Sequence, residues 1–139
     1  MHNCSTIIIH CIDFRLINKT REWMSQNNLI GDADVVSIAG SSKALVDGSK
    51  EIQEFILKQI NISYNLHNAR KVILLHHSNC GAYKVDYDFI DGEAEIAQQL
   101  EDMYAAEEII KNCFEEIDVK KIWAQIKDPH KEEVEFSEL

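Results

Sequence analysis

The chain has 139 residues, of which 45% are hydrophobic and 27% charged, and 14 Lys and Arg against 24 Asp and Glu give a formal charge of -10. A chain of this length buries roughly two thirds of its unfolded surface, so residues 1–139 are expected to form a single domain that needs no disulfides. The excess of carboxylates argues against nucleic acid and anionic membrane surfaces as partners, because phosphate groups attract clustered Lys and Arg.

The sequence also lacks the usual signals for export. No stretch approaches the ~20 apolar residues that span a bilayer. The residues Met1-His2-Asn3-Cys4 show none of the regions of a signal peptide, so a cytoplasmic location with free thiols is expected. The four cysteines show no C-x-x-C spacing, which favours metal ligation over thioredoxin-like redox chemistry.

The first part of the chain predicts two strands around one helix. A β-branched run from Thr6 to Ile12 is typical of a buried strand. Asn18 or Thr20 is expected to begin a helix that ends near Asn28, and a second strand is expected from Val35 to Ala39.

Two later segments have apolar residues at helical spacing and predict amphipathic helices. The first carries Ile52, Phe55, Ile56 and Ile60 on its inner face. The second is longer, and its expected inner stripe is Ile96, Leu100, Met103, Ala106, Ile110, Cys113 and Phe114.

The remaining strands complete a predicted sheet. The run from Lys71 to His76 has no polar alternation in its centre and predicts a strand buried on both faces. A late strand is expected from Lys121 to Lys127, then a turn at Pro129 and an edge strand from Val134 to Phe136. The predicted class is therefore α/β, a three-layer fold whose mainly parallel central sheet is flanked by helices and ends in a C-terminal hairpin or edge strand.

Residues that can bind a metal ion lie just after two of these predicted strands. Cys11 follows the first strand, and His77 and Cys80 follow the third. Ligands of open α/β sheets bind at the carboxyl ends of the strands, and two thiolates with one imidazole suit zinc. Asp13 is expected either to take the fourth coordination position or to accept a hydrogen bond from a bound water, with Arg15 holding its carboxylate.

The pattern C-x-D-x-R after a first strand and H-x-x-C-G after a later one resembles the β-class carbonic anhydrases. The paired histidines His76-His77 are similar to those of a short group called putative carbonic anhydrases. The resemblance implies zinc held by Cys11, His77 and Cys80, and interconversion of carbon dioxide and bicarbonate by a zinc-bound hydroxide. It further implies that Asp13 and Arg15 act in catalysis and that the chain forms a homodimer or a higher homo-oligomer.

One departure from the family pattern leaves two alternatives open. Ser37-Ile38-Ala39-Gly40 stands where the family commonly has Arg-Asn-Ala-Gly. The loss of two polar groups motivates a non-catalytic zinc protein on the same fold as one alternative. The other alternative is hydrolysis of a related small molecule such as carbon disulfide.

Several other residues are given structural roles. Cys113 is expected in the core, Cys4 near a frayed end, and His10 and His76 away from the metal. Asn79, Tyr83 and Ser37 either line the pocket or have ordinary turn, packing and strand-end roles. Twelve of the 24 acidic residues lie between Asp86 and Asp118, where a solvated helix face is expected.

Overall fold

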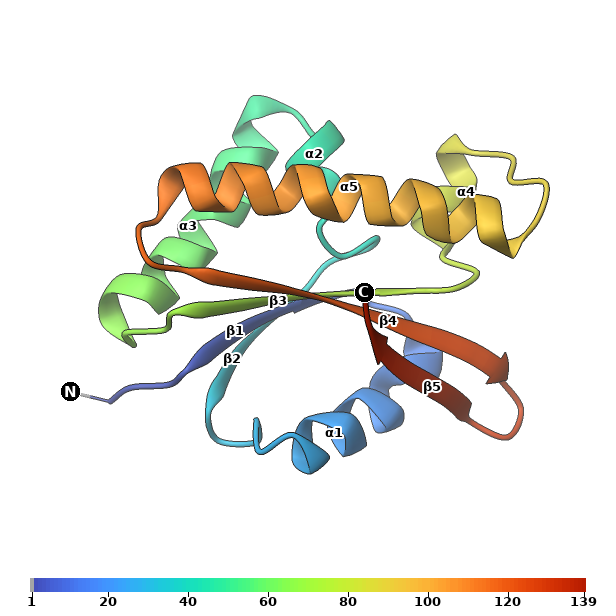
Figure 1. The fold of residues 1–139 in the computed structure, drawn as a ribbon, viewed down its shortest axis with the longest axis horizontal. Coiled ribbons are helices and arrows are strands. Elements are labelled where there is room, and N and C mark those ends of the chain that lie inside the picture. Colours follow the sequence, from blue (N-terminus) through green and yellow to red (C-terminus); the bar gives the residue numbers. More distant parts are fainter. Residues whose placement is uncertain (1) are drawn as a thin grey trace.

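The computed structural model describes residues 2–139 and consists of a five-stranded sheet with helices on both faces (Figure 1). The strand order is β2-β1-β3-β4-β5, with the first four parallel and β5 antiparallel to β4. The strands are β1 (Thr6–His10), β2 (Ala33–Ser37), β3 (Lys71–His77), β4 (Asp118–Asp128) and β5 (Glu133–Glu138). The helices are η1 (Phe14–Leu16), α1 (Ile17–Gln26), α2 (Lys43–Asp47), α3 (Lys50–Leu66), α4 (Gly81–Asp86) and α5 (Gly92–Cys113).

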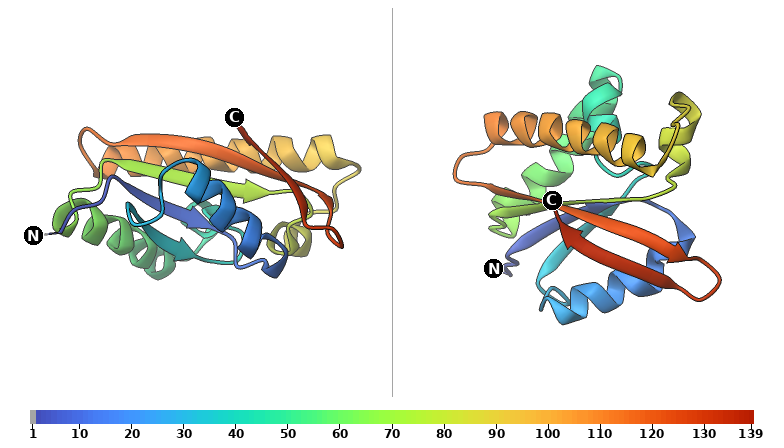
Figure 2. Two further views of the ribbon diagram at one scale, coloured as in Figure 1. Left: turned by 90° about the horizontal axis from the view of Figure 1, so that it is seen from below. Right: turned by 45° about the vertical axis from the view of Figure 1, so that its right-hand side comes forward.

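The helices form two unequal layers. Helices α2, α3 and α5 lie on one face of the sheet, and α1 lies on the other, next to the β4–β5 hairpin (Figures 1 and 2). The larger core cluster packs the sheet against α3 and α5, and a smaller one packs it against α1. The predicted three-layer α/β class with a C-terminal hairpin is thus confirmed.

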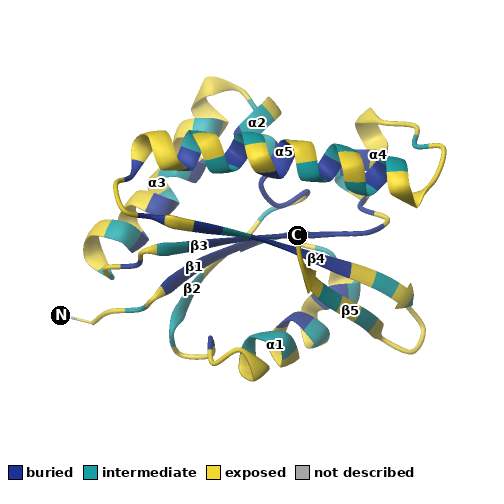
Figure 3. Ribbon diagram, viewed as in Figure 1, coloured by how far each residue is buried: buried dark blue, intermediate teal, exposed yellow. Residues whose placement is uncertain are grey.

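Strand β3 is the central strand of the sheet. Val72, Ile73, Leu74 and Leu75 are at most 4% exposed, as a parallel strand covered on both faces requires (Figure 3). β1 and β4 lie on either side of β3, and His10 pairs with Leu75. Because β1 and β3 are parallel neighbours, the segments after His10 and His77 leave the same edge of the sheet.

The structure corrects the prediction for the inner face of α3. Ile56 and Ile60 are buried, but Ile52 and Phe55 are 49% and 61% exposed. Only part of the apolar stripe can contact the sheet, because a helix packs over a limited arc of its circumference. The short helices α2 and α4 were not among the predicted elements, because five or six residues are too few to show a period.

Of two further predictions about α5, one is wrong and one holds only in part. Cys113 is exposed rather than in the core, because the buried stripe passes from Ile110 to Phe114. The acidic stretch is only partly solvated, since Glu95 and Asp102 are buried against the loop after β3 and against Tyr83 of α4. None of the helices within residues 2–139 combines the length and the apolar character needed to cross a membrane.

Candidate metal centre

Cys11, His77 and Cys80 converge at the carboxyl edge of the sheet. Cys11 follows β1, His77 is the last residue of β3, and Cys80 is the N-cap of α4. One potential ligand atom from each lies within 4.8 Å of the others, and all three side chains are buried. Buried Sγ, Sγ and Nε2 atoms in this arrangement match the donor types that zinc prefers.

The orientation of the His77 ring fits the role of a ligand. Its Nδ1–H donates to the carbonyl oxygen of Ser78 at 2.8 Å, which leaves Nε2 as the nitrogen with a free lone pair. Nε2 is buried and has no hydrogen-bond partner among residues 2–139. An unpaired buried acceptor is costly, and a metal ion would satisfy it. The residues present therefore fit a zinc ion.

The two thiols lie in an environment that favours a thiolate at Cys11. The neighbouring Cys80 thiol, His77 and the backbone N–H of Gly40 together lower the pKa of Cys11. The nearness of Cys11, together with burial, raises the pKa of Cys80. The thiolate is the form that binds a metal, so Cys11 is prepared for that role.

Gly40 approaches the thiol as only a glycine can. Its N–H lies 3.4 Å from the Cys11 sulfur, and its φ is +79°. A Cβ at this position would lie 3.0 Å from the Cβ of Ala82 and 3.1 Å from that of Lys43. The glycine kept from the family pattern after β2 thus supports the candidate centre directly.

Asp13 and Arg15 form an ion pair at the edge of the three donors. Nε and Nη2 of Arg15 donate to the two carboxylate oxygens of Asp13 at 2.9 and 2.6 Å. Nη2 also donates to the carbonyl oxygen of Asn79 at 3.0 Å, which ties the two motifs together. The Arg15 side chain lowers the pKa of Asp13, and the Asp13 Oδ2 lies 3.8 Å from Nε2 of His77.

Two buried side chains of α5 hold the backbone of residues 77–80, the ligand loop, and the sequence interpretation missed both. Glu95 accepts hydrogen bonds from the N–H groups of Asn79 and Cys80 at 2.7 and 3.1 Å. Gln99 donates to the carbonyl oxygen of His77 at 3.0 Å. Glu95 and Gln99 continue the spacing of the buried stripe toward the start of α5, a periodic signal that charge and polarity concealed.

His76 has a structural role, as predicted. Its Nδ1–H donates to Gln99 at 3.0 Å, and its Nε2 accepts from the Ser42 hydroxyl at 2.7 Å. Burial lowers the pKa of His76 to about 4, so the ring is neutral near pH 7. His10 is partly buried and bonded to the carbonyl oxygen of Cys11, outside the donor group.

The other candidate pocket residues have ordinary places. Tyr83 is fully buried and donates to Asp102 at 2.8 Å, while Ser37 is exposed at the end of β2. Asn79 adopts a φ of +55°, and its contribution is the carbonyl oxygen that Arg15 binds. A hollow of about 620 Å³ opens beside Asn79 and Glu95 at this edge.

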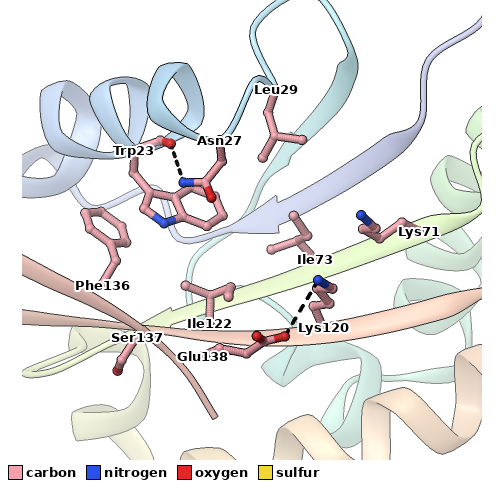
Figure 4. Close-up of a pocket in the computed structure, with 10 residues that line it drawn as sticks. All are labelled: Trp23, Asn27, Leu29, Lys71, Ile73, Lys120, Ile122, Phe136, Ser137 and Glu138. Atoms are coloured by element: carbon pink, nitrogen blue, oxygen red, sulfur yellow. Dashed lines mark hydrogen bonds and ion pairs between the residues drawn. The ribbon is translucent and has the colours of Figure 1, made fainter.

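A second cavity, of about 270 Å³, lies on the α1 face of the sheet (Figure 4). Trp23 and Phe136 stack at 5.5 Å on one side, and Ile73 and Ile122 belong to the sheet. Lys120 forms an ion pair with Glu138 there. Its lining residues come from α1 and the turn after it, from β5 and from the first halves of β3 and β4, so it is separate from the three metal donors.

Comparisons with known proteins give one consistent result. A family model described as "Putative carbonic anhydrase" matches residues 1–135. An uncharacterized protein of Rickettsia bellii is 36% identical over 127 residues, which cover 86% of this chain and 75% of the relative. A second, from Rickettsia conorii, is 34% identical, and the chain covers 66% of its length.

Solved structures share the fold at low sequence identity. A β-carbonic anhydrase of Aspergillus fumigatus has a TM-score of 0.63 at 10% identity, with 98% of this chain and 76% of that one covered. One of two tetrameric β-carbonic anhydrases from Sordaria macrospora has a TM-score of 0.62 at 13% identity, covering 98% and 81%. A carbon disulfide hydrolase has a TM-score of 0.54 at 12% identity, covering 96% and 78%. These likenesses concern the fold alone, which is that of the β-carbonic anhydrases. The family model shows that this chain belongs to the putative carbonic anhydrase family.

Proposed function

We propose that this chain is a zinc-dependent enzyme that hydrates carbon dioxide reversibly to bicarbonate. The observation that carries the proposal is the buried group of Cys11, His77 and Cys80 with an Asp–Arg pair at its edge. Zinc held by these three residues would lower the pKa of a bound water to about 7 and so supply hydroxide near neutral pH.

Asp13 and Arg15 are proposed to control the attacking water. Arg15 binds both oxygens of the Asp13 carboxylate, which keeps the carboxylate ionised and fixed in orientation. An ionised carboxylate next to the donors can accept a hydrogen bond and hold the water for attack. With its carboxylate held by Arg15, Asp13 would be kept from acting as a fourth metal ligand.

Zinc analysis with stopped-flow carbon dioxide hydration tests this proposal. The zinc-loaded chain should accelerate hydration above the buffer rate at neutral or mildly alkaline pH, and Asp13→Asn should bind zinc but lose most of that rate. Zinc-loaded protein that adds nothing to the buffer rate would reject the enzymatic proposal.

The segment after β2 supports a second candidate, hydrolysis of a related small molecule such as carbon disulfide. Ile38 packs against the larger core and Ser37 is exposed, so neither contributes a polar side chain to the candidate centre. A different pocket wall changes which small, linear substrate is preferred. A screen of carbon dioxide against carbon disulfide separates the two activities, and zinc binding without either favours a non-catalytic zinc protein.

We further propose that the chain forms a homodimer or a higher homo-oligomer in a reducing compartment, the cytoplasm. The Sordaria proteins are tetrameric. Phe14, Val85 and Ile90 are more than 80% exposed in segments that follow β1 and β3, which is unusual for large apolar side chains. The four cysteines are free thiols.

Light scattering after size-exclusion chromatography tests the assembly. The unaltered chain should have a mass of at least two protomers, and Phe14→Asp should shift it toward the monomer, because a carboxylate cannot be buried cheaply in an apolar contact. Phe55→Asp on α3, which is also exposed, is the matched control and should leave the mass unchanged. A monomeric unaltered chain would contradict this proposal.

A further inference from the structure

A second group of metal-ligand side chains lies at the other end of the sheet. Cys4 precedes β1, Asp34 belongs to β2, and His67 is the C-cap of α3. One donor atom from each lies within 4.8 Å of the others. The N-terminal segment and the end of α3 lie side by side at this end (Figure 1), where Cys4 N–H donates to the carbonyl oxygen of His67 at 2.9 Å. Cys4 is therefore held in place, and the prediction from the sequence that it lies near a frayed end is wrong.

The contacts within this group centre on one carboxylate oxygen. Oδ2 of Asp34 lies 3.6 Å from the Cys4 sulfur and 2.6 Å from Nδ1 of His67. It also accepts a hydrogen bond from the Ser63 hydroxyl at 2.7 Å. In a tetrahedral zinc site with bonds of about 2.0 to 2.3 Å, neighbouring donors are roughly 3.3 to 3.8 Å apart. The sulfur–oxygen distance already fits, and the nitrogen–oxygen distance needs to open by less than about 1 Å.

We propose that Cys4, Asp34 and His67 form a second binding site for a divalent transition metal of the zinc class. One thiolate, one imidazole and one carboxylate are a borderline donor set that suits zinc rather than calcium or magnesium. The site is partly open, with the side chains of His67 and Asp34 26% and 34% exposed, so solvent can provide the fourth ligand. Ser63 stays hydrogen-bonded to the ligating carboxylate and orients it.

Binding of the metal exchanges protons in a defined way. The Cys4 thiol releases its proton to solvent. Nδ1 of His67 gives up the proton that it donates to Asp34, and the ligating ring carries its proton on Nε2. The ion then replaces the hydrogen bonds that Cys4 and His67 now make to Asp34. It would join the N-terminal segment, the edge strand β2 and the end of α3, and so stabilise this end of the molecule.

The two candidate centres are far enough apart to be tested separately. Cys4 and Cys11 lie on either side of β1, and seven residues of extended chain span roughly 20 Å. Loss of one centre therefore leaves the ligands of the other in place.

The test is the zinc content of the full chain after equilibration with a zinc–chelator buffer. Cys4→Ser should bind one zinc per chain fewer than the unaltered chain, and Cys113→Ser, which alters an exposed thiol, should bind as many. If only the second site exists, the counts are one and zero, and if both exist they are two and one. Equal zinc content in the unaltered chain and Cys4→Ser would overturn the proposal, whatever the state of the Cys11 centre.

A second measurement keeps the proposal testable should Cys4→Ser not fold. In the unaltered chain, zinc should slow the alkylation of Cys4 by iodoacetamide, followed by peptide mass spectrometry, and leave that of Cys113 unchanged. His67→Gln should abolish this protection of Cys4. Protection that survives His67→Gln, or none at all in the unaltered chain, would reject the site.

Discussion

At the scale of single residues, Arg15 connects the two motifs of the candidate centre. It binds both oxygens of Asp13 and the carbonyl oxygen of Asn79, 64 residues further along the chain. Lys has one ammonium group and cannot make this planar, two-pronged contact. The position therefore requires the geometry of Arg as well as its charge.

Replacement of Arg15 by Lys should lower carbon dioxide hydration about 10- to 100-fold without loss of zinc, because Asp13 would no longer be held in one orientation. The pKa of Asp13 should rise toward its ordinary value, so that the carboxylate stays protonated to higher pH. Stopped-flow rates with zinc analysis check the first outcome, and carboxyl NMR titration checks the second. Arg21→Lys, at an exposed position on α1, is the control, and an R15K enzyme of full activity would contradict the assigned role.

Glu95 offers a second test at this scale. Its two oxygens accept separate backbone N–H groups of the ligand loop, and Glu95→Gln keeps only one acceptor. The loop should hold Cys80 less firmly, and zinc affinity should fall about 10- to 100-fold in competition with a chromophoric chelator. Glu101→Gln, on an exposed part of α5, should have no effect. Equal affinity for both variants would show that Glu95 does not support the loop.

The three proposed ligands were predictable from the sequence and Glu95 was not, for a physical reason. Cys11 and His77 lie next to apolar runs that predict strands, and parallel strands bring their ends to one edge. Glu95 lies in a stretch whose many carboxylates indicate solvent, and its burial depends on which loop α5 covers. Gly40 was predictable only in part, since its place in the motif is visible in the sequence but its contact with the Cys11 sulfur is not.

At the scale of elements, α3 shows what the periodicity of apolar residues can and cannot predict. Its existence follows from the apolar spacing, but the orientation of its apolar face does not, because neighbouring apolar residues satisfy the pattern equally well. The strands were predicted to within a few residues because short apolar runs are unambiguous when bounded by turns. The helices α2 and α4 depend on tertiary contacts that no local pattern specifies.

Two adjacent residues of α3 provide a direct test of this orientation. Ile56→Ala should lower the free energy of unfolding by about 2 to 5 kcal/mol, because the side chain is only 1% exposed and truncation leaves a cavity. Phe55→Ala removes a larger side chain, yet at 61% exposure it should change stability by less than about 0.5 kcal/mol. Urea denaturation of the two variants measures both values, and a larger loss for Phe55→Ala would mean that α3 is rotated.

At the scale of the whole molecule, the main cores are independent of the metal ligands. The two larger clusters pack α3, α5 and α1 on the sheet, while Cys11 and Cys80 belong to a small third cluster with Tyr83. A domain that depends on zinc for folding usually lacks such cores. The ion at the candidate centre is thus expected to serve chemistry more than stability.

Removal of a ligand should therefore separate metal binding from folding. Cys80→Ala should lose zinc from the candidate centre and retain its far-UV circular dichroism and a cooperative thermal transition. Cys113→Ala should keep both the zinc and the fold, because its thiol is exposed on α5. An unfolded Cys80→Ala would instead support a structural role for the metal.

The parallel pairing of β1 with β3 has a consequence for how the molecule is assembled. Cys11 meets His77 and Cys80 only when two strands more than 60 residues apart in the chain are in register, a slow, long-range event. The absorption of a thiolate-bound cobalt ion, followed during refolding, should therefore appear only once that pairing is complete. Metal binding by the three proposed ligands would then report when β1 pairs with β3 during folding.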